Sequence, residues 1–196
     1  MQGAKKELRK AVQNALSLLS AESVTRENRF ICETILNSPD YRNARHVGLY
    51  MAMPSSRINE VNLDAVVSDA LANGKHCYIP RVEKDGAAMV FVRIESLADL
   101  QPNSWAILEP VPRENEFNVL KERQRLDVIY VPGLAFDADG SRLGRGKGYY
   151  DAFLAQMGGK IARKVGVGFA CQLLERGTIP TSPRDVAVDQ VITGPR

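Results

Sequence analysis

The strongest constraint on the fold is one apolar run, residues 126–132, which reads LDVIYVP. Apolar and β-branched residues follow one another in this run without the alternation of a half-exposed strand. A continuous run of this kind is typical of a parallel strand that is buried on both faces. Because such a sheet needs helices on both sides, the run predicts an α/β fold.

Helical and strand-like patterns alternate along the rest of the chain. The expected helices are 4–19, 23–37, 61–73 and 149–157, and the expected strands are 46–51, 77–80, 88–94, 126–132, 164–169 and 190–193. Residues 95–125 contain three prolines and a strongly charged stretch, so we expect loops and short turns there. The pattern predicts a single three-layer domain over residues 1–196. Its central sheet would be mostly parallel and covered by helices on both faces.

Composition excludes several classes of protein. Of the 196 residues, 44% are hydrophobic and 25% are charged, which is ordinary for a globular protein. No apolar run approaches the roughly 18 residues of a membrane-spanning helix, so we expect no membrane partner. The net charge of +3 suits an anionic small ligand but is low for a dedicated nucleic-acid binder.

Cysteine usage indicates a reducing compartment. Cys32, Cys77 and Cys171 are far apart and there are only two histidines, so a disulfide framework or a zinc site is not expected. The N-terminus has no secretory leader. Glu7 and the regular apolar spacing favour a folded helix over an organelle presequence. We expect a cytoplasmic protein, with a mitochondrial location as the alternative.

The segment that carries chemistry is 140–151, GSRLGRGKGYYD, with four glycines in its first nine residues. Glycines let a backbone approach a ligand closely. Backbone N–H groups at a helix start favour a phosphate, and Arg142, Arg145 and Lys147 would neutralise its charge. The glycine spacing fits neither a Walker A loop nor the Rossmann fingerprint. The pattern indicates a phosphate-binding loop, with a surface turn and solvated basic side chains as the alternative.

Asp151 follows this segment in the first turn of the expected helix. An acid at this position complements the helix dipole. It could equally hold Mg²⁺ beside a nucleotide phosphate, because Mg²⁺ is commonly bound by one or two carboxylates plus phosphates. Both interpretations stay open from the residues alone.

Residues 127–137 and 142–151 together resemble the signature of the 5-formyltetrahydrofolate cyclo-ligase family, also called 5,10-methenyltetrahydrofolate synthetases. Further segments resemble family blocks in the same order: 5–9, 74–80, 107–110 (ILEP), 168–173 and 185–189. The resemblance therefore covers nearly the whole chain.

The resemblance implies an ATP- and Mg²⁺-dependent enzyme. It would convert 5-formyltetrahydrofolate, with or without a polyglutamate tail, into 5,10-methenyltetrahydrofolate, giving ADP and phosphate. The γ-phosphoryl group passes to the formyl oxygen, N10 attacks the activated carbon, and phosphate leaves. Such chemistry needs positioning and charge stabilisation more than a protein nucleophile. We expect a monomer with no nucleic-acid partner.

Site residues follow from the resemblance position by position. ATP would be bound by Lys5, Lys6, Arg9, Arg142, Leu143, Gly144, Arg145, Gly146, Lys147, Gly148, Tyr149 and Tyr150. The folate would be bound by Met53, Glu60, Trp105, Arg145, Gly146, Lys147, Gly148 and Tyr149. Arg145 and Lys147 would act on the transferring phosphoryl group, and Asp151 and Asp185 would bind Mg²⁺.

Structural alternatives exist for several of these residues. Lys5 and Arg9 could belong to a solvated helix face, and Tyr149 and Tyr150 could be a packed aromatic pair. Trp105 could anchor a loop instead of stacking on the folate.

The chain departs from the family pattern after the first expected strand. The family has a glutamate there, followed by a hydrophobic residue, an acid and a threonine. Residues 60–63 fit this pattern without the threonine, and 57–60 fit it with arginine in place of the glutamate. Two registers therefore remain open for the substrate-side glutamate.

Three other functions compete with the cyclo-ligase. A folate-binding relative without turnover would lose the phosphate or metal groups, whereas Arg145, Lys147 and Asp151 are all present. An RNA-associated protein would need a stronger basic patch or an RNA-binding motif. A different ATP-dependent ligase or kinase would not explain a resemblance along the whole chain.

Overall fold

A computed structural model of the chain describes residues 2–53, 59–83, 86 and 88–195. Its central sheet has six strands in the order β11-β9-β6-β1-β2-β3. In that order they are Gln190–Thr193, Ile161–Gly168, Leu126–Pro132, His46–Gly48, His76–Val82 and Met89–Ile94. Every neighbouring pair is parallel except β2 and β3, which are antiparallel. The mostly parallel sheet is therefore confirmed, with 126–132 as an inner strand.

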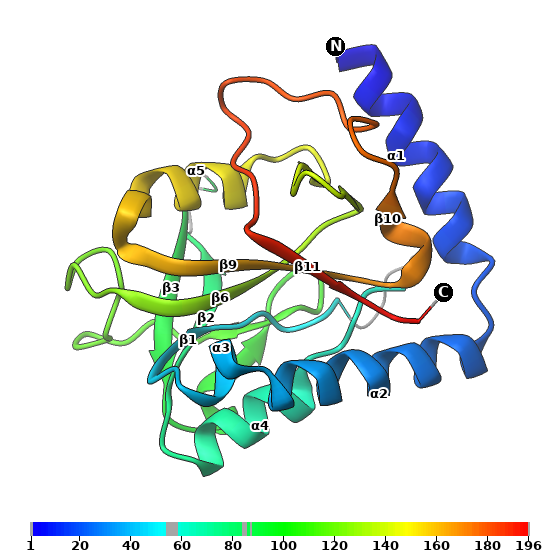
Figure 1. Ribbon diagram of the computed structural model, residues 1–196. Helices are drawn as coiled ribbons and strands as arrows, with labels where there is room; N and C mark the ends of the chain where they lie inside the picture. The colour runs from blue at the N-terminus through cyan, green and yellow to red at the C-terminus, as the bar shows by residue number, and fades with distance from the viewer. Residues whose placement is uncertain (1, 54–58, 84–85, 87, 196) are drawn as a thin grey trace.

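Helices cover both faces of this sheet (Figure 1). The helices are α1 (Gln2–Ser17), α2 (Ala21–Asn37), α3 (Pro39–Arg42), α4 (Asp64–Ala72) and α5 (Tyr149–Met157). In Figure 1, α2, α3 and α4 lie below the sheet, α5 lies above it, and α1 stands beside one end. This is the three-layer arrangement that the sequence predicts. Within the described ranges, no helix is long and apolar enough to cross a membrane.

The β6 side chains explain the continuous apolar run. Val128 and Tyr130 belong to the core on the side of α2 and α4, whereas Ile129 and Val131 pack with Phe153 of α5. All four strand residues are fully buried. A strand between two helical layers has no solvent-facing side, so it lacks polar alternation.

Most helix ends lie within two residues of the prediction: α1 spans 2–17 instead of 4–19, and α2 begins at Ala21 instead of residue 23. Ser20 caps α2 by accepting the Ser23 N–H at 3.1 Å, and α5 begins and ends where the sequence predicts. The helix expected at 61–73 is shorter than predicted: α4 begins at Asp64, because Val61 and Leu63 are buried in the connection before it. A short helix that the sequence did not predict, α3, follows α2, with Pro39 in its first turn.

Short strands account for the largest difference from the sequence prediction. Residues 95–125 were expected to be loops, but β4 (Leu100–Pro102) and β5 (Leu108–Pro110) form an antiparallel pair. A second small sheet joins β10 (Leu173–Leu174), β7 (Ala135–Asp137) and β8 (Arg142–Leu143). The described residues also form three short 3₁₀ helices: η1 (Leu97–Asp99), η2 (Gly158–Lys160) and η3 (Ala170–Gln172). Two- and three-residue strands are too short for a periodic pattern to reveal.

The topology brings several segments to one end of the sheet. The parallel strands β1, β2 and β6 have their carboxyl ends there, and the chain leaves β6 through β7 and β8 toward α5. Open α/β sheets bind ligands beyond the carboxyl ends of their strands. The fold therefore places the glycine-rich segment where a ligand site is expected.

Phe136 depends on two glycines for its space. A Cβ at Gly133 would lie 2.7 Å from Cζ of this buried ring, and a Cβ at Gly166 would overlap the ring as well. We expect Gly166→Ala to lower the free energy of unfolding by about 1–3 kcal/mol, because the core would be overpacked. Urea unfolding measures the change. Gly159→Ala is the matched control, since nothing lies within 4 Å of its Cβ, and a similar loss in both variants would contradict the packing argument.

Candidate functional site

A cavity of about 590 Å³ opens at the carboxyl ends of β1, β2 and β6. One side, here called the polar wall, is lined by Lys5, Arg9, Arg142, Gly144, Arg145, Gly146, Lys147, Gly148, Asp151 and Asp185. The other side, the apolar wall, is lined by Met51, Met53, Pro80, Val82, Met89, Trp105, Ile107 and Leu108. Ligand sites commonly combine such an apolar surface with a few converging polar groups.

Residues 144–148, the glycine loop, connect β8 to α5. Gly146 and Gly148 have φ angles of +103° and +75°, which side-chain-bearing residues rarely adopt. Gly148 is the N-cap of α5 and offers no side chain to the first turn of the helix. The N–H groups at this helix start therefore have no side-chain cap, and they can bind an anion.

Arg142 is buried beneath this loop instead of projecting into solvent. Its guanidinium forms an ion pair with Asp151 Oδ2 at 2.9 Å and donates to the Pro132 carbonyl at 3.3 Å. The Tyr150 ring packs over it, with the guanidinium carbon 5.4 Å from the ring centroid. Arg142 thus connects the end of β6 to the first turn of α5.

Helix α1 reaches the polar wall through two basic side chains. Lys5 Nζ lies 2.6 Å from Asp185 Oδ2, and Arg9 Nε donates to the Gly144 carbonyl at 2.9 Å. Burial alone would raise the pKa of Asp185, but hydrogen bonds from Lys5 and the Ser182 N–H outweigh burial and lower it. A segment near the N-terminus is thereby held against one near the C-terminus.

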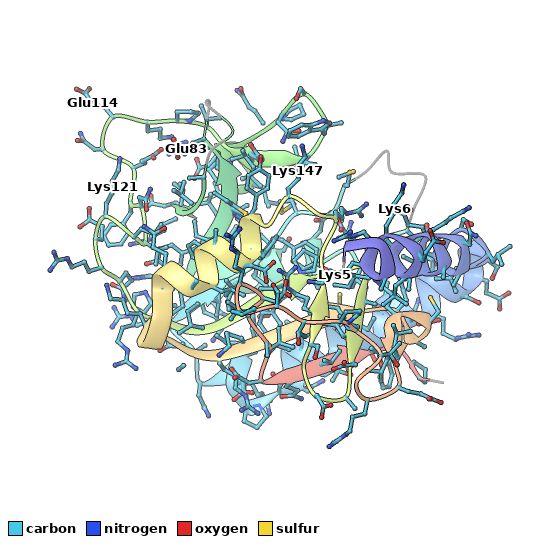
Figure 2. The ribbon with its side chains drawn as sticks, turned by 90° about the horizontal axis from the view of Figure 1, so that it is seen from above. Lys5, Lys6, Glu83, Glu114, Lys121 and Lys147 are labelled. Carbon is cyan, nitrogen blue, oxygen red and sulfur yellow. The ribbon has the colours of Figure 1, made fainter. Side chains whose placement is uncertain are left out.

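Lys6 is the predicted ATP-binding residue that lies apart from the others. It is exposed, and it is absent from the described lining of the cavity. Figure 2 shows Lys5 and Lys6 on opposite sides of α1. Consecutive helical residues point about 100° apart, so one of the two faces the site and the other faces solvent.

Asp151 and Asp185 lie close together on the polar wall. The Val186 N–H, next to Asp185 in the chain, donates to Asp151 Oδ1 at 3.2 Å. No group of three or more metal-ligating side chains occurs in the part of the chain that the structure describes. Mg²⁺ typically uses one or two carboxylates together with phosphate oxygens, so this donor set fits Mg²⁺ bound with a nucleotide. Metal binding by these residues stays a prediction.

The two residues with predicted catalytic roles differ in their surroundings. Arg145 Nη2 lies 3.1 Å from Glu60 Oε1, and Glu60 Oε2 accepts the Met53 N–H at 3.1 Å. Lys147 is exposed at the cavity, with its side chain on the glycine loop (Figure 2). Glu60 therefore holds the Arg145 side chain close to the Met53 backbone. The alternative register begins at residues 57 and 58, which lie outside the described residues.

Trp105 lies in the turn between β4 and β5, where the sequence predicted no strands. Its side chain is 55% exposed at the cavity, so it has a free ring face. The Asn103 side chain shapes the turn by accepting the N–H groups of Trp105 and Ile107 at 2.8 and 3.1 Å. This exposure leaves the ring available for stacking, and both interpretations of Trp105, as a stacking surface and as a loop anchor, stay predictions.

The two tyrosines at the start of α5 contact different parts of the protein. The Tyr149 hydroxyl donates to the Gly86 carbonyl at 3.1 Å, which joins α5 to the β2–β3 connection. Tyr150 packs against Phe91, and burial raises the pKa of its phenol. Both still line the cavity, together with Leu143.

Sequence reasoning missed part of the lining. The missed residues are Tyr50, Met51, Pro80, Val82, Met89, Ile107, Leu108, Glu109, Pro132 and Gly133. Several of them end strands that were correctly predicted, so the rule that ligands bind at the carboxyl ends of strands could have found them. Residues 107–109 lie in the segment 107–110 that resembles a family block, but no pattern predicted the β4–β5 pair that brings them to the cavity.

Comparisons with known proteins give one consistent result. A sequence model of the 5-formyltetrahydrofolate cyclo-ligase family matches residues 1–194. The mitochondrial 5-formyltetrahydrofolate cyclo-ligase of Arabidopsis thaliana is 33% identical over 96% of this chain and 73% of its own length. The Mus musculus 5-formyltetrahydrofolate cyclo-ligase is also 33% identical, over 96% of this chain and 93% of its own. The solved 5,10-methenyltetrahydrofolate synthetase of Aquifex aeolicus superposes with a TM-score of 0.78 at 34% identity, covering 96% of this chain and 89% of that one.

The ion pair under the glycine loop generates a stability prediction. Because the Arg142 side chain is only 3% exposed, Asp151→Asn leaves a buried guanidinium without its counter-ion. We expect a loss of about 3 kcal/mol in the free energy of unfolding, measured by urea titration. Asp139→Asn is the control, because it removes an acid paired with the exposed Arg176 and should cost below about 1 kcal/mol. Equal losses in both variants would show that the buried pair has no special weight.

Proposed function

The chain belongs to the 5-formyltetrahydrofolate cyclo-ligase family, and we propose that the cavity between its polar and apolar walls is the active site. The protein is an enzyme that converts 5-formyltetrahydrofolate into 5,10-methenyltetrahydrofolate. One observation carries the assignment of the site: a cavity of about 590 Å³ combines cations and free backbone N–H groups with an aromatic, apolar surface. The first surface suits phosphates and the second suits a pterin.

The reaction requires that a poor leaving group be activated. ATP, which the family uses, supplies the phosphoryl group that is transferred to the formyl oxygen. N10 then forms a bond to the formyl carbon, the bond from that carbon to the phosphorylated oxygen breaks, and phosphate leaves. Positioning and neutralisation of developing charge are the main demands on the protein.

The polar wall is suited to the nucleotide. We assign the phosphates to the N–H groups of the glycine loop and the start of α5, with Lys5 and Arg9 reaching them from α1. Lys147 and Arg145 would contact the transferring phosphoryl group, because both are exposed cations of the glycine loop that line the cavity. Asp151 and Asp185 would hold Mg²⁺, which supplies positive charge beside the phosphates.

The apolar wall is suited to the folate. We assign the pterin and benzoyl rings to Trp105, Met53 and Tyr149, where the half-exposed indole provides a stacking surface. A single copy of the chain provides both walls. We therefore propose that residues 1–196 act as one domain and as a monomer.

The activity itself is tested with purified protein, 5-formyltetrahydrofolate and Mg-ATP, following methenyltetrahydrofolate by its absorbance. Product should form only when both ATP and Mg²⁺ are present. Folate binding without any product would overturn the activity in favour of a silent binding protein.

Lys147→Ala tests the assignment of the polar wall. We expect kcat to fall roughly 100-fold or more, because a cation that stabilises transferring charge is lost. Lys121→Ala is the control: this lysine is also exposed but lies far from Lys147 in Figure 2, outside the cavity lining. An unchanged kcat in Lys147→Ala would remove that residue from the reaction.

A further inference from the structure

Glu109 is the one acid of the described cavity lining that is not paired with a cation of the described residues. Among the described lining residues, the other three acids are paired: Glu60 with Arg145 at 3.1 Å, Asp151 with Arg142 at 2.9 Å and Asp185 with Lys5 at 2.6 Å. Glu109 forms no ion pair with any residue that the structure describes.

Arg81 acts electrostatically on Glu109 but is paired with other acids. Arg81 binds Glu116 through two nitrogens, each 2.6 Å from a carboxylate oxygen, and reaches Glu83 at 3.2 Å. Because these contacts use the ends of the guanidinium, Arg81 influences Glu109 only at longer range. No cation of the described residues therefore balances the charge on Glu109, so a ligand can interact with it.

The local fold holds this carboxylate at the apolar wall. Glu109 is the middle residue of β5, half-buried, and it lines the cavity beside Val82, Met89 and Ile107. Its carboxylate accepts the Val82 N–H at 3.4 Å and a hydrogen bond from the Asn103 side chain. Burial raises the pKa of Glu109. Burying a carboxylate costs free energy, and neutral hydrogen bonds compensate that cost only in part. Further N–H donors from a ligand would therefore stabilise Glu109.

The substrate of the proposed function has such donors. The pterin ring of 5-formyltetrahydrofolate carries a 2-amino group and the N3–H side by side on one edge. Two parallel N–H donors match the two oxygens of a carboxylate, in the way that a guanidinium does. The opposite part of the ring system carries the N5-formyl group.

We infer that Glu109 is a specificity-determining residue, which binds the 2-amino and N3–H edge of the pterin. This inference rests on the proposed function. With that edge held at β5 and the ring against the apolar wall, the N5-formyl oxygen points toward the glycine loop. Glu60, the substrate acid suggested by the sequence, is less suited, because its negative charge is already balanced by Arg145.

The test compares the full chain with Glu109→Gln, using two ligands. One is 5-formyltetrahydrofolate, and the other is its analogue with a methyl group in place of the 2-amino group. Kd is measured by quenching of the single tryptophan, Trp105, which lines the cavity, so the comparison does not require turnover. Wild-type protein should bind the analogue roughly 10- to 100-fold more weakly than the substrate, as expected for lost hydrogen bonds to a charged group.

Glu109→Gln should bind the substrate roughly 10- to 100-fold more weakly, and should no longer discriminate between the two ligands. Its KM for ATP should stay within about twofold, because the polar wall is intact. The amide oxygen can still accept the Val82 N–H, so the unfolding midpoint should not fall. Glu114→Gln is the matched control, since it removes the same charge from an exposed acid outside the cavity lining, and both Kd values should be unchanged.

Two results would overturn the inference. One is equal binding of substrate and analogue by wild-type protein, which is decisive even if the variant does not fold. The other is a variant that discriminates as well as wild type, whatever its stability. Absence of methenyltetrahydrofolate formation by wild-type protein would instead count against the proposed function, so the two failures are distinguishable.

Discussion

The buried contact between Arg142 and Asp151 organises the polar side of the cavity. A guanidinium taken out of water loses its hydration, so it is stable there only with good partners. Arg142 finds them in the Asp151 carboxylate, the Pro132 carbonyl and the Tyr150 ring. These partners belong to the end of β6 and the first turn of α5, and the arginine itself lies in β8. One side chain therefore fixes the relative positions of three elements.

The glycine loop follows from this contact. A Cβ at Gly144 would lie 3.2 Å from Arg142 Nη1, so the backbone folds closely over the guanidinium. Gly146 and Gly148 then take the positive φ angles that bring the chain into α5. Backbone N–H groups fixed in this way need not reorganise when a charged ligand arrives. That preorganisation is a large component of electrostatic catalysis.

Helix α1 is attached in two different ways along its length. Val12 and Leu16 pack into the main core, whereas Lys5 and Arg9 make only polar contacts at the cavity. Lys5 is paired with an acid of the same wall, as is Arg142. Phosphates bound at the polar wall, as we propose, would compete with Asp185 and Asp151 for these two cations. Nucleotide binding would therefore weaken or replace these ion pairs. The apolar wall has the opposite character: its acid, Glu109, has no cation among the described residues and invites a donor.

The sequence by itself determined the features that repeat over a few residues. The run 126–132, the helix start at Tyr149, the Ser20 cap and the glycines of the loop each have a local physical cause, namely burial on two faces, helical period, capping or positive φ. The sequence also identified most residues of the cavity lining, because the family motifs mark their positions along the chain. Tertiary structure alone decided which basic residues are buried, paired with an acid or exposed. Arg142 is buried under the loop while Lys147 is exposed, and Lys5 faces Asp185, 180 positions away, while Lys6 faces solvent. The pairing of β4 with β5, which places Trp105 and Glu109 in the cavity lining, likewise had no periodic signal in the sequence. Contacts between distant segments depend on how helices and strands pack, and no local period records that packing.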